Sequence, residues 1–234
     1  MKKLATATAA LMFSATTALG GTLTLAEPEP QIYTPAPAPA FSWAGGYVGL
    51  FAGVARGTYL LGVSELDEEG PDVDVRGTVG GAFAGYNWHE GNTVFGVELD
   101  ASTGPSGVTE QGTAGPVWLC GTGDCYVDIS SVITLRGRVG IAADRMHFYG
   151  TAGLAHAQVS GGIENSVQDG SGSATGWVAG VGAEWAASES FVLRAEYLHH
   201  DLGALPFGQG FAPDDVFDGV GSFGVLRIGG AFRF

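Results

Sequence analysis

The sequence predicts an all-β protein, an eight-stranded antiparallel up-and-down β-barrel that spans a membrane. Three observations predict this fold. The chain begins with an export signal and has no later run of the roughly 18 apolar residues that a spanning helix needs. Glycine is abundant, at 40 of 234 residues, and glycine destabilises helices. Apolar residues recur at alternate positions in segments of roughly ten residues, the pattern of strands that face lipid on one side.

The first 42 residues are predicted to lie outside the barrel. Residues 1–26 have the layout of a secretory signal peptide, with two lysines, an apolar Ala- and Thr-rich stretch and a small-x-small ending at Thr24–Ala26. We predict cleavage after Ala26, in preference to a membrane anchor, because the segment is rich in Thr and Gly. Residues 27–42 alternate Pro and Ala and are predicted to form an extended periplasmic tether rather than a recognition motif. Residues 43–234 are predicted to form the barrel.

The charge of the mature chain excludes one class of partner. The two lysines of the signal peptide are the only lysines in the sequence, so the mature chain has eight arginines against 24 acidic residues, a formal net charge of −16. Nucleic-acid binding needs a basic surface. We therefore expect no nucleic-acid partner.

Eight segments carry the strand pattern, and short and long connections alternate between them. This alternation places all short turns at one rim of the barrel and all long loops at the other. The strands are predicted near 44–56, 76–88, 93–103, 127–141, 146–159, 174–186, 190–201 and 222–234. The short turns are predicted at 89–92, 142–145 and 186–189, and the long loops at 57–75, 104–126, 160–173 and 202–221.

Charged residues in these strands share the face opposite the large apolar residues. In FVLRAEYLHH, Phe191, Leu193 and Tyr197 face one way, and Arg194 and Glu196 face the other. A β-sandwich in water would turn its apolar face inward, so we place the charged face in the lumen. An eight-stranded barrel has room only for side chains, which predicts a plug of ion pairs. The predicted lumen charge network is Glu98, Asp100, Arg136, Arg138, Glu184, Arg194, Glu196, Arg227 and Arg233.

Aromatic residues cluster near the short turns and at the end of the chain. The last strand, VLRIGGAFRF, must pair with the first strand to close the barrel, and it ends in Phe232 and Phe234. This ending looks like the signal that outer-membrane assembly machinery reads, so we expect that machinery and periplasmic chaperones as partners during biogenesis. The aromatic girdle predicted at the short-turn rim comprises Trp88, Phe95, Phe148, Trp185, Phe191, Phe232 and Phe234.

Two loop features suggest local chemistry. Cys120 and Cys125 are separated by GTGD, and in an exported protein this spacing predicts a local disulfide, because a metal site needs more ligands. The acidic segment 65–74, ELDEEGPDVD, is predicted to be a solvated loop. Its carboxylates could bind a divalent cation, but it lacks the ligand spacing of an EF-hand. We assign no metal and no cofactor.

A histidine pair raises the alternative of an enzyme. His199 and His200 precede Asp201 at the end of a predicted strand, but neighbouring strand residues face opposite sides, so the imidazoles do not converge. Some eight-stranded barrels are lipid A-modifying enzymes with Ser and His on the lipid-facing wall. No serine is placed opposite His199 with an orienting acid. We therefore predict no catalytic residue.

Several segments resemble a known family. GYNWHEGNTVFGVELD (85–100), LRGRVGIAADRMHFYGTAGLAHA (135–157), GWVAGVGAEWAASESFVLRAEYLHHDLG (176–203) and the last strand are similar to the small outer-membrane β-barrel proteins of alphaproteobacteria, called porin-family or opacity-like proteins. The resemblance covers all eight predicted strands. It implies an integral protein of the outer membrane of a Gram-negative bacterium, surrounded by lipid and lipopolysaccharide, with surface-exposed loops. The long acidic first loop and the cysteine pair depart from the usual pattern.

The resemblance implies a structural and surface-display role in the envelope, with a host or surface ligand at the loops. The family has no agreed catalytic residues. Two alternatives remain open at this point. One is a narrow channel for ions or very small solutes, lined by Arg136, Arg138, Arg194, Glu98 and Glu184, and the other is a lipid A-modifying enzyme.

Overall fold

The computed structural model describes residues 41–63, 68–210 and 214–234. The predicted signal peptide and nearly all of the predicted tether lie outside the described residues. Among the described residues, no helix is both long and apolar enough to cross a membrane.

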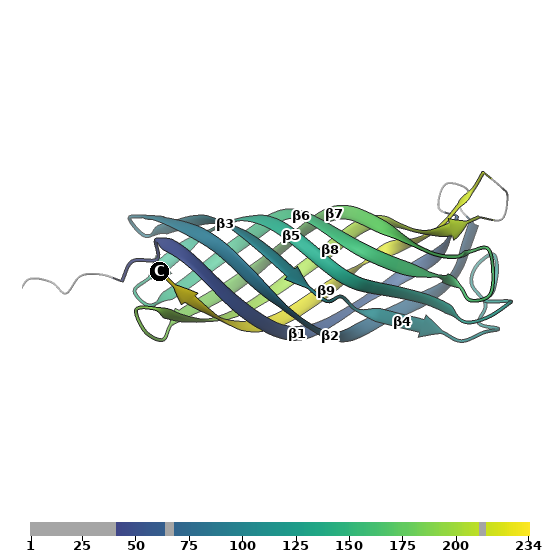
Figure 1. Cartoon of the computed structure of the whole chain (residues 1–234), viewed down its shortest axis with the longest axis horizontal. Coiled ribbons are helices and arrows are strands. Elements are labelled where there is room, and N and C mark those ends of the chain that lie inside the picture. Colours follow the sequence, from purple (N-terminus) through teal and green to yellow (C-terminus); the bar gives the residue numbers. More distant parts are fainter. Residues whose placement is uncertain (1–40, 64–67, 211–213) are drawn as a thin grey trace, which may run out of the picture. The chain divides into compact units, whose positions relative to one another are not determined.

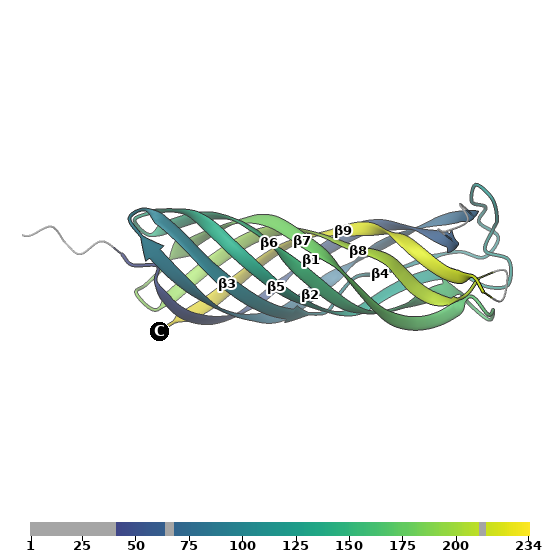
Figure 2. The same cartoon turned by 90° about the horizontal axis from the view of Figure 1, so that it is seen from above.

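Antiparallel strands close into one barrel (Figures 1 and 2). The strands are β1 (Gly45–Val63), β2 (Glu68–Glu90), β3 (Thr93–Ser102), β4 (Ser106–Thr109), β5 (Cys125–Ala143), β6 (Met146–Ile163), β7 (Asp169–Ala186), β8 (Phe191–Gln209) and β9 (Val216–Arg233). The short β4 continues the line of β3, since both pair with β2 on one side and β5 on the other. Counting β3 and β4 as one strand position, the barrel has eight strands, which confirms the predicted fold class. Pairing of β1 with β9, from Tyr47 opposite Arg233 to Gly62 opposite Asp218, closes it.

Most of the predicted strand ends toward the long loops are wrong, although β3 ends at Ser102, next to the predicted residue 103. β1 continues to Val63 instead of residue 56, β2 begins at Glu68 instead of 76, and β8 reaches Gln209 instead of 201. The predicted loops 57–75, 160–173 and 202–221 are mostly strand in their described parts, including the acidic segment from Glu68 onward, whereas most of the predicted loop 104–126 is loop. The reason is that the two faces of the wall change character at this level: the inward residues become apolar and the outward residues become polar. Tyr59 is buried in the barrel and Thr58 is exposed outside, so the apolar-outward pattern used to predict strands ends here although the strand continues.

The interior is packed in layers. Charged side chains fill the part nearer the short turns, as the next subsection describes. Toward the long loops the interior is an apolar core that includes Tyr59, Val75, Ile129, Leu205 and Phe217. A smaller apolar cluster contains Phe41, Trp43, Val94, Ala142, Ala186 and Val192, and it lies at the short-turn end, where β1 begins.

The outer wall carries the apolar band expected of a lipid-facing surface. Its exposed residues include Leu50, Leu135, Val181 and Ile228. Near the short turns Trp88 stacks on Phe95 with ring centroids 5.7 Å apart, and Phe191 packs on Phe232 at 5.2 Å. These pairs occupy the rim where the sequence predicts an aromatic girdle.

Candidate functional site

The strand register brings acidic and basic residues opposite each other in the lumen. Glu98 on β3 faces Arg136 on β5, and Glu184 on β7 faces Arg194 on β8. Glu196 on β8 faces Arg227 on β9. Each of these residues is inward because its neighbours in sequence are lipid-facing, so the alternation of the strands itself assembles the site. With Asp100 and Arg138, which lie opposite uncharged residues, eight charged side chains meet in the lumen, and all are buried: Glu98, Asp100, Arg136, Arg138, Glu184, Arg194, Glu196 and Arg227.

Arg136 is the centre of one half of the network. Its guanidinium donates to Asp100 at 2.8 Å, to Glu196 at 3.1 Å and to Glu98. Its Nε donates to the hydroxyl of Thr134 at 3.1 Å, and that hydroxyl donates to Asp100 at 2.8 Å. One arginine therefore contacts three carboxylates. Such a buried cluster is stable only when the other oxygens of those carboxylates also have partners.

Glu184 is the centre of the other half. It lies 2.8 Å from Arg138, 2.6 Å from Arg194 and 2.9 Å from Nδ1 of His147. The same two arginines reach the second oxygen of Glu98, at 3.1 and 2.7 Å. Glu98 thus joins the two halves into one network.

Aromatic side chains enclose the guanidinium groups. The hydroxyl of Tyr47 donates to Glu98 at 2.9 Å, and that of Tyr149 donates to Glu196 at 2.9 Å. The arginine carbons lie over ring faces at cation–π distances. The shortest of these contacts are Arg138 over Tyr149 at 3.9 Å, Arg194 over Phe83 at 4.1 Å and Arg227 over Phe51 at 4.1 Å.

Arg233 does not join the network, which corrects one predicted site residue. Its guanidinium donates to the backbone carbonyls of Ser42 at 2.6 Å and Ala44 at 3.1 Å, and it lies 4.8 Å from the ring centroid of Phe41. The reason is its position at the end of β9, at the rim rather than inside the barrel. Without Arg233 the network has four arginines and four carboxylates, so its formal charges balance.

The residues just before β1 cap the short-turn end. Trp43 is buried, its indole N–H donates to the carbonyl of Asp144 at 3.1 Å, and its ring lies 5.1 Å from that of His147. Phe41 and Ser42, which the sequence assigns to the tether, take part in this cap. The cap places an apolar layer directly beneath the charges.

Sequence reasoning missed His147, Tyr47 and Tyr149 as members of the network. The available signal was alternation: Phe148 is lipid-facing, so residues 147 and 149 point inward. Histidine and tyrosine were not among the residue types searched for, because the search was for Asp, Glu and Arg.

His199 and His200 lie on opposite sides of the wall. His199 packs beside Trp177 at 5.4 Å on the outside, whereas His200 is buried inside and stacks on Phe223 at 4.6 Å. Asp201 accepts a hydrogen bond from the backbone N–H of Gly203 at 3.0 Å. In the described part of the chain, no group of three His, Cys, Asp or Glu side chains is placed to hold a metal ion.

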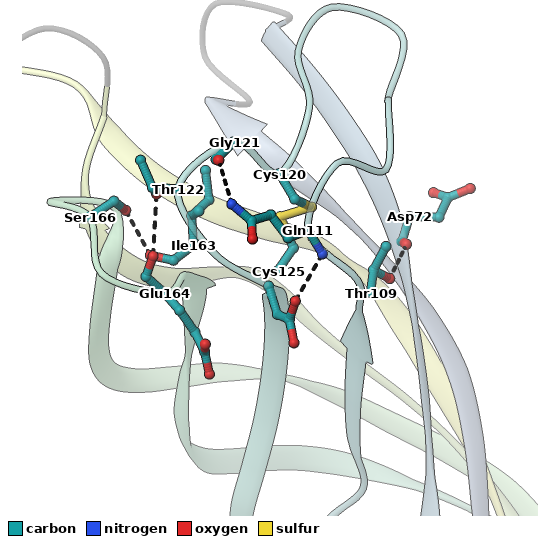
Figure 3. The surroundings of a disulfide bond; sticks show 11 residues. Asp72, Thr109, Gln111, Cys120, Gly121, Thr122, Cys125, Ile163, Glu164 and Ser166 are labelled. Carbon is teal, nitrogen blue, oxygen red and sulfur yellow. Dashed lines mark hydrogen bonds between the residues drawn. A yellow bond between two sulfur atoms is a disulfide. The ribbon is translucent and has the colours of Figure 1, made fainter.

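The predicted disulfide is present and joins Cys120, in the loop that precedes β5, to Cys125, the first residue of β5 (Figure 3). Both cysteines are buried in the apolar core, and Trp118 of the same loop packs against it. The backbone N–H of Gln111 donates to Asp124 at 2.8 Å, and its side-chain amide donates to the carbonyl of Gly121 at 2.9 Å. The loop is therefore folded onto the barrel end.

Comparison with known proteins agrees with this architecture. A family model described as the outer membrane protein beta-barrel domain matches residues 32–234. The 31 kDa outer-membrane immunogenic protein of Brucella melitensis biotype 1 is 38% identical over the whole of both chains. The 22 kDa outer membrane protein of Rhizobium leguminosarum bv. viciae is 31% identical and covers 78% of this chain and 79% of its own.

Among solved structures, the outer membrane protein OprG from Pseudomonas aeruginosa matches with a TM-score of 0.50 at 15% identity, over 82% of this chain and 96% of that chain. That likeness supports the fold alone. The family match, together with the eight-stranded barrel and its lipid-facing band, shows that this chain belongs to the outer membrane protein β-barrel family and resides in the outer membrane of a Gram-negative bacterium.

Proposed function

We propose that this barrel has a structural and surface-display function: it holds its loops at a fixed height above the outer membrane and neither conducts solutes nor catalyses a reaction. The observation that carries the proposal is the exchange of polarity along the wall. On β1 the outward residue Val54 is followed by Arg56 and Thr58, and on β2 the outward residues at this level include Asp72 and Asp74. A polar outer wall is stable in water and unstable in lipid.

Above the lipid-facing band the barrel stays packed. On β5, β6 and β7 the outer wall carries Ser130, Ser160, Ser171 and Ser173 around a shallow polar groove. The interior at the loop end of the barrel is the apolar core, which the loop containing the disulfide covers. A projecting segment with its own core is rigid, and a rigid segment presents its loops in one arrangement.

The relatives support display at the cell surface. The Brucella proteins are named outer-membrane immunogenic proteins, and exposed loops on this chain would be open to recognition in the same way. A host or surface ligand at the loops is part of this proposal. So is recognition of the last strand by assembly machinery and periplasmic chaperones, since Phe234 is 82% exposed.

The packing of the lumen argues against the channel alternative. The four arginines and four carboxylates are bound to one another, with the Trp43 cap on one side and the apolar core on the other. An ion would have to displace buried ion pairs and then cross an apolar layer, and both steps are unfavourable. The outward His199 and inward His200 argue likewise against a lipid A-modifying site.

Epitope insertion tests the display function. We expect a tag inserted at Asn165, in the turn between β6 and β7, to bind antibody on intact cells. The control is the same tag at Gly91, in the short turn between β2 and β3, which should bind antibody only after the outer membrane is permeabilised. Both turns have positive φ and exposed residues, so both tolerate insertion. Labelling of the Gly91 tag alone on intact cells, or of neither tag in a folded barrel, would overturn the proposal.

A further inference from the structure

The arginines of this chain fall into three groups. No lysine follows residue 3, so arginine is the only strong base in the barrel. Four arginines lie in the lumen network, and Arg145 and Arg233 lie at the short-turn end. The remaining two, Arg56 and Arg76, lie on the outer wall toward the long loops.

Arg56 and Arg76 are directly opposite each other in the pairing of β1 with β2, and both are exposed. Like charges in this position repel each other. Within the described part of the chain, Arg56 has no ion pair. Arg76 lies 3.6 Å from Asp74 in an exposed contact, and that carboxylate also accepts a hydrogen bond from Thr58 at 2.9 Å. Arg56 and Arg76 thus carry two adjacent positive charges, of which the Asp74 carboxylate compensates one.

The level of the pair is the edge of the lipid-facing band. The next outward residues toward the short turns are Val54 and Thr78, and those toward the loops are Thr58 and Asp74. At this depth a side chain meets the headgroups of the outer leaflet. Paired guanidinium groups match the oxygen geometry of a phosphate, and basic clusters at membrane surfaces bind anionic headgroups.

An apolar trough continues from the pair along β2. Between Arg76 and Tyr86, toward the short turns, every outward residue of β2 is small: Thr78, Gly80, Ala82 and Ala84. From Arg76 to Ala84 the strand covers about 26 Å at 3.3 Å per residue. At a strand tilt of about 45° this is about 19 Å of depth, more than the roughly 15 Å of hydrocarbon in one leaflet. The groove at its lower part is lined by Leu50, Ala82, Ala84, Leu99, Ala101 and Ile133.

A polar groove adjoins the pair on its other side. It is lined by Asp72, Asp74, Arg76, Ser106 and Thr109 on β2 and β4. Carboxylate and hydroxyl oxygens accept hydrogen bonds from sugar hydroxyls but repel a second phosphate. This lining favours a sugar-bearing headgroup over a simple phospholipid.

We propose that Arg56 and Arg76 bind a phosphate of an outer-leaflet glycolipid, with an acyl chain in the trough of β2 and the sugar in the groove beside β4. All three parts lie on the outward face of β2 and its two neighbours, in the order in which such a lipid presents them. The site is separate from the lumen and does not depend on the display function.

Native mass spectrometry of the refolded barrel in neutral detergent, titrated with monophosphorylated lipid A, tests this site. We expect the R56Q/R76Q double variant to bind lipid A at least about tenfold more weakly, because two charge-assisted contacts are lost. Ala82→Leu, which fills the trough, should also weaken binding. Arg145→Gln at the opposite rim is the matched control and should bind within twofold of the unsubstituted protein.

Two further ligands test whether the site recognises the phosphate of lipid A or the phosphate of any lipid. Lipid A without phosphates should bind the unsubstituted barrel and R56Q/R76Q equally, and phosphatidylglycerol should bind more weakly than lipid A. The proposal is overturned if R56Q/R76Q retains lipid A within twofold, or if phosphatidylglycerol or inorganic phosphate competes as well as lipid A. It is also overturned if a dimer forms that Ala82→Leu disrupts, since the trough would then be an interface between two barrels. Heat-dependent gel mobility checks that each variant is folded.

Discussion

Replacing Arg136 by Met should destabilise the barrel strongly. Arg136 is 1% exposed and compensates Glu98, Asp100 and Glu196. Its removal leaves four buried carboxylates with three arginines, and breaking a buried ion pair from one side destabilises by about 3–5 kcal/mol. Asp100 loses most, because its other ion pair is with Arg227 at 3.2 Å.

Urea unfolding in detergent, followed by heat-dependent gel mobility, measures this loss. Adding Asp100→Asn to Arg136→Met restores three arginines to three carboxylates, so the double variant should lose clearly less than the sum of the single losses. Arg145→Gln serves as the control, because Arg145 pairs with Glu189 on the exposed rim and such pairs contribute no more than about 1 kcal/mol. A loss below about 1 kcal/mol for Arg136→Met, or strict additivity in the double variant, would refute the account of the network.

Three further predictions concern other parts of the barrel. Trp43→Ala should lower the free energy of unfolding by about 3–5 kcal/mol, because a buried indole leaves a cavity in the cap; a shift in the urea midpoint measures it, and an unchanged midpoint would show that the cap is dispensable. Replacing Cys120 and Cys125 together by Ala, which buries no new polar group, should lower the same quantity by no more than about 2 kcal/mol, since the closed loop is short; a larger loss would contradict this. Partial burial and the hydrogen bond to Asp169 raise the pKa of Tyr126 to about 12. The folded state therefore holds this proton more tightly than the unfolded chain, so its contribution to stability is lost as pH rises from about 10 to 12. The difference in absorbance at alkaline pH between the protein and its Tyr126→Phe variant measures the ionisation, and a midpoint near 10 would be the contrary result.

Much of the fold could be predicted because the membrane imposes one rule on every strand. Inside the lipid-facing band, residues such as Leu193 and Arg194 must take opposite faces, and this alternation is visible in the sequence. The rule ends where lipid ends. Beyond that level Tyr59 points inward and Thr58 outward, so a search for lipid-facing alternation takes real strands for loops.

Alternation in the sequence also predicts only part of the lumen network. Alternation assigns a face but gives no height along the barrel, so Arg233 shares the face of Arg227 yet lies at the rim instead of in the network. Trp43 was not foreseen as a cap because it precedes the first strand and follows no alternation. His147 was missed because a histidine is recognised as part of the network only when Glu184 is seen beside it.

The central claim is that the lumen is closed, and conductance across a planar lipid bilayer tests it most directly. The folded mature barrel should insert and stay silent, because the balanced charges around Arg136, the Trp43 cap and the apolar core leave no path for hydrated ions. Discrete, reproducible openings that change when Arg136 is replaced would contradict the claim and establish a channel lined by the charge network.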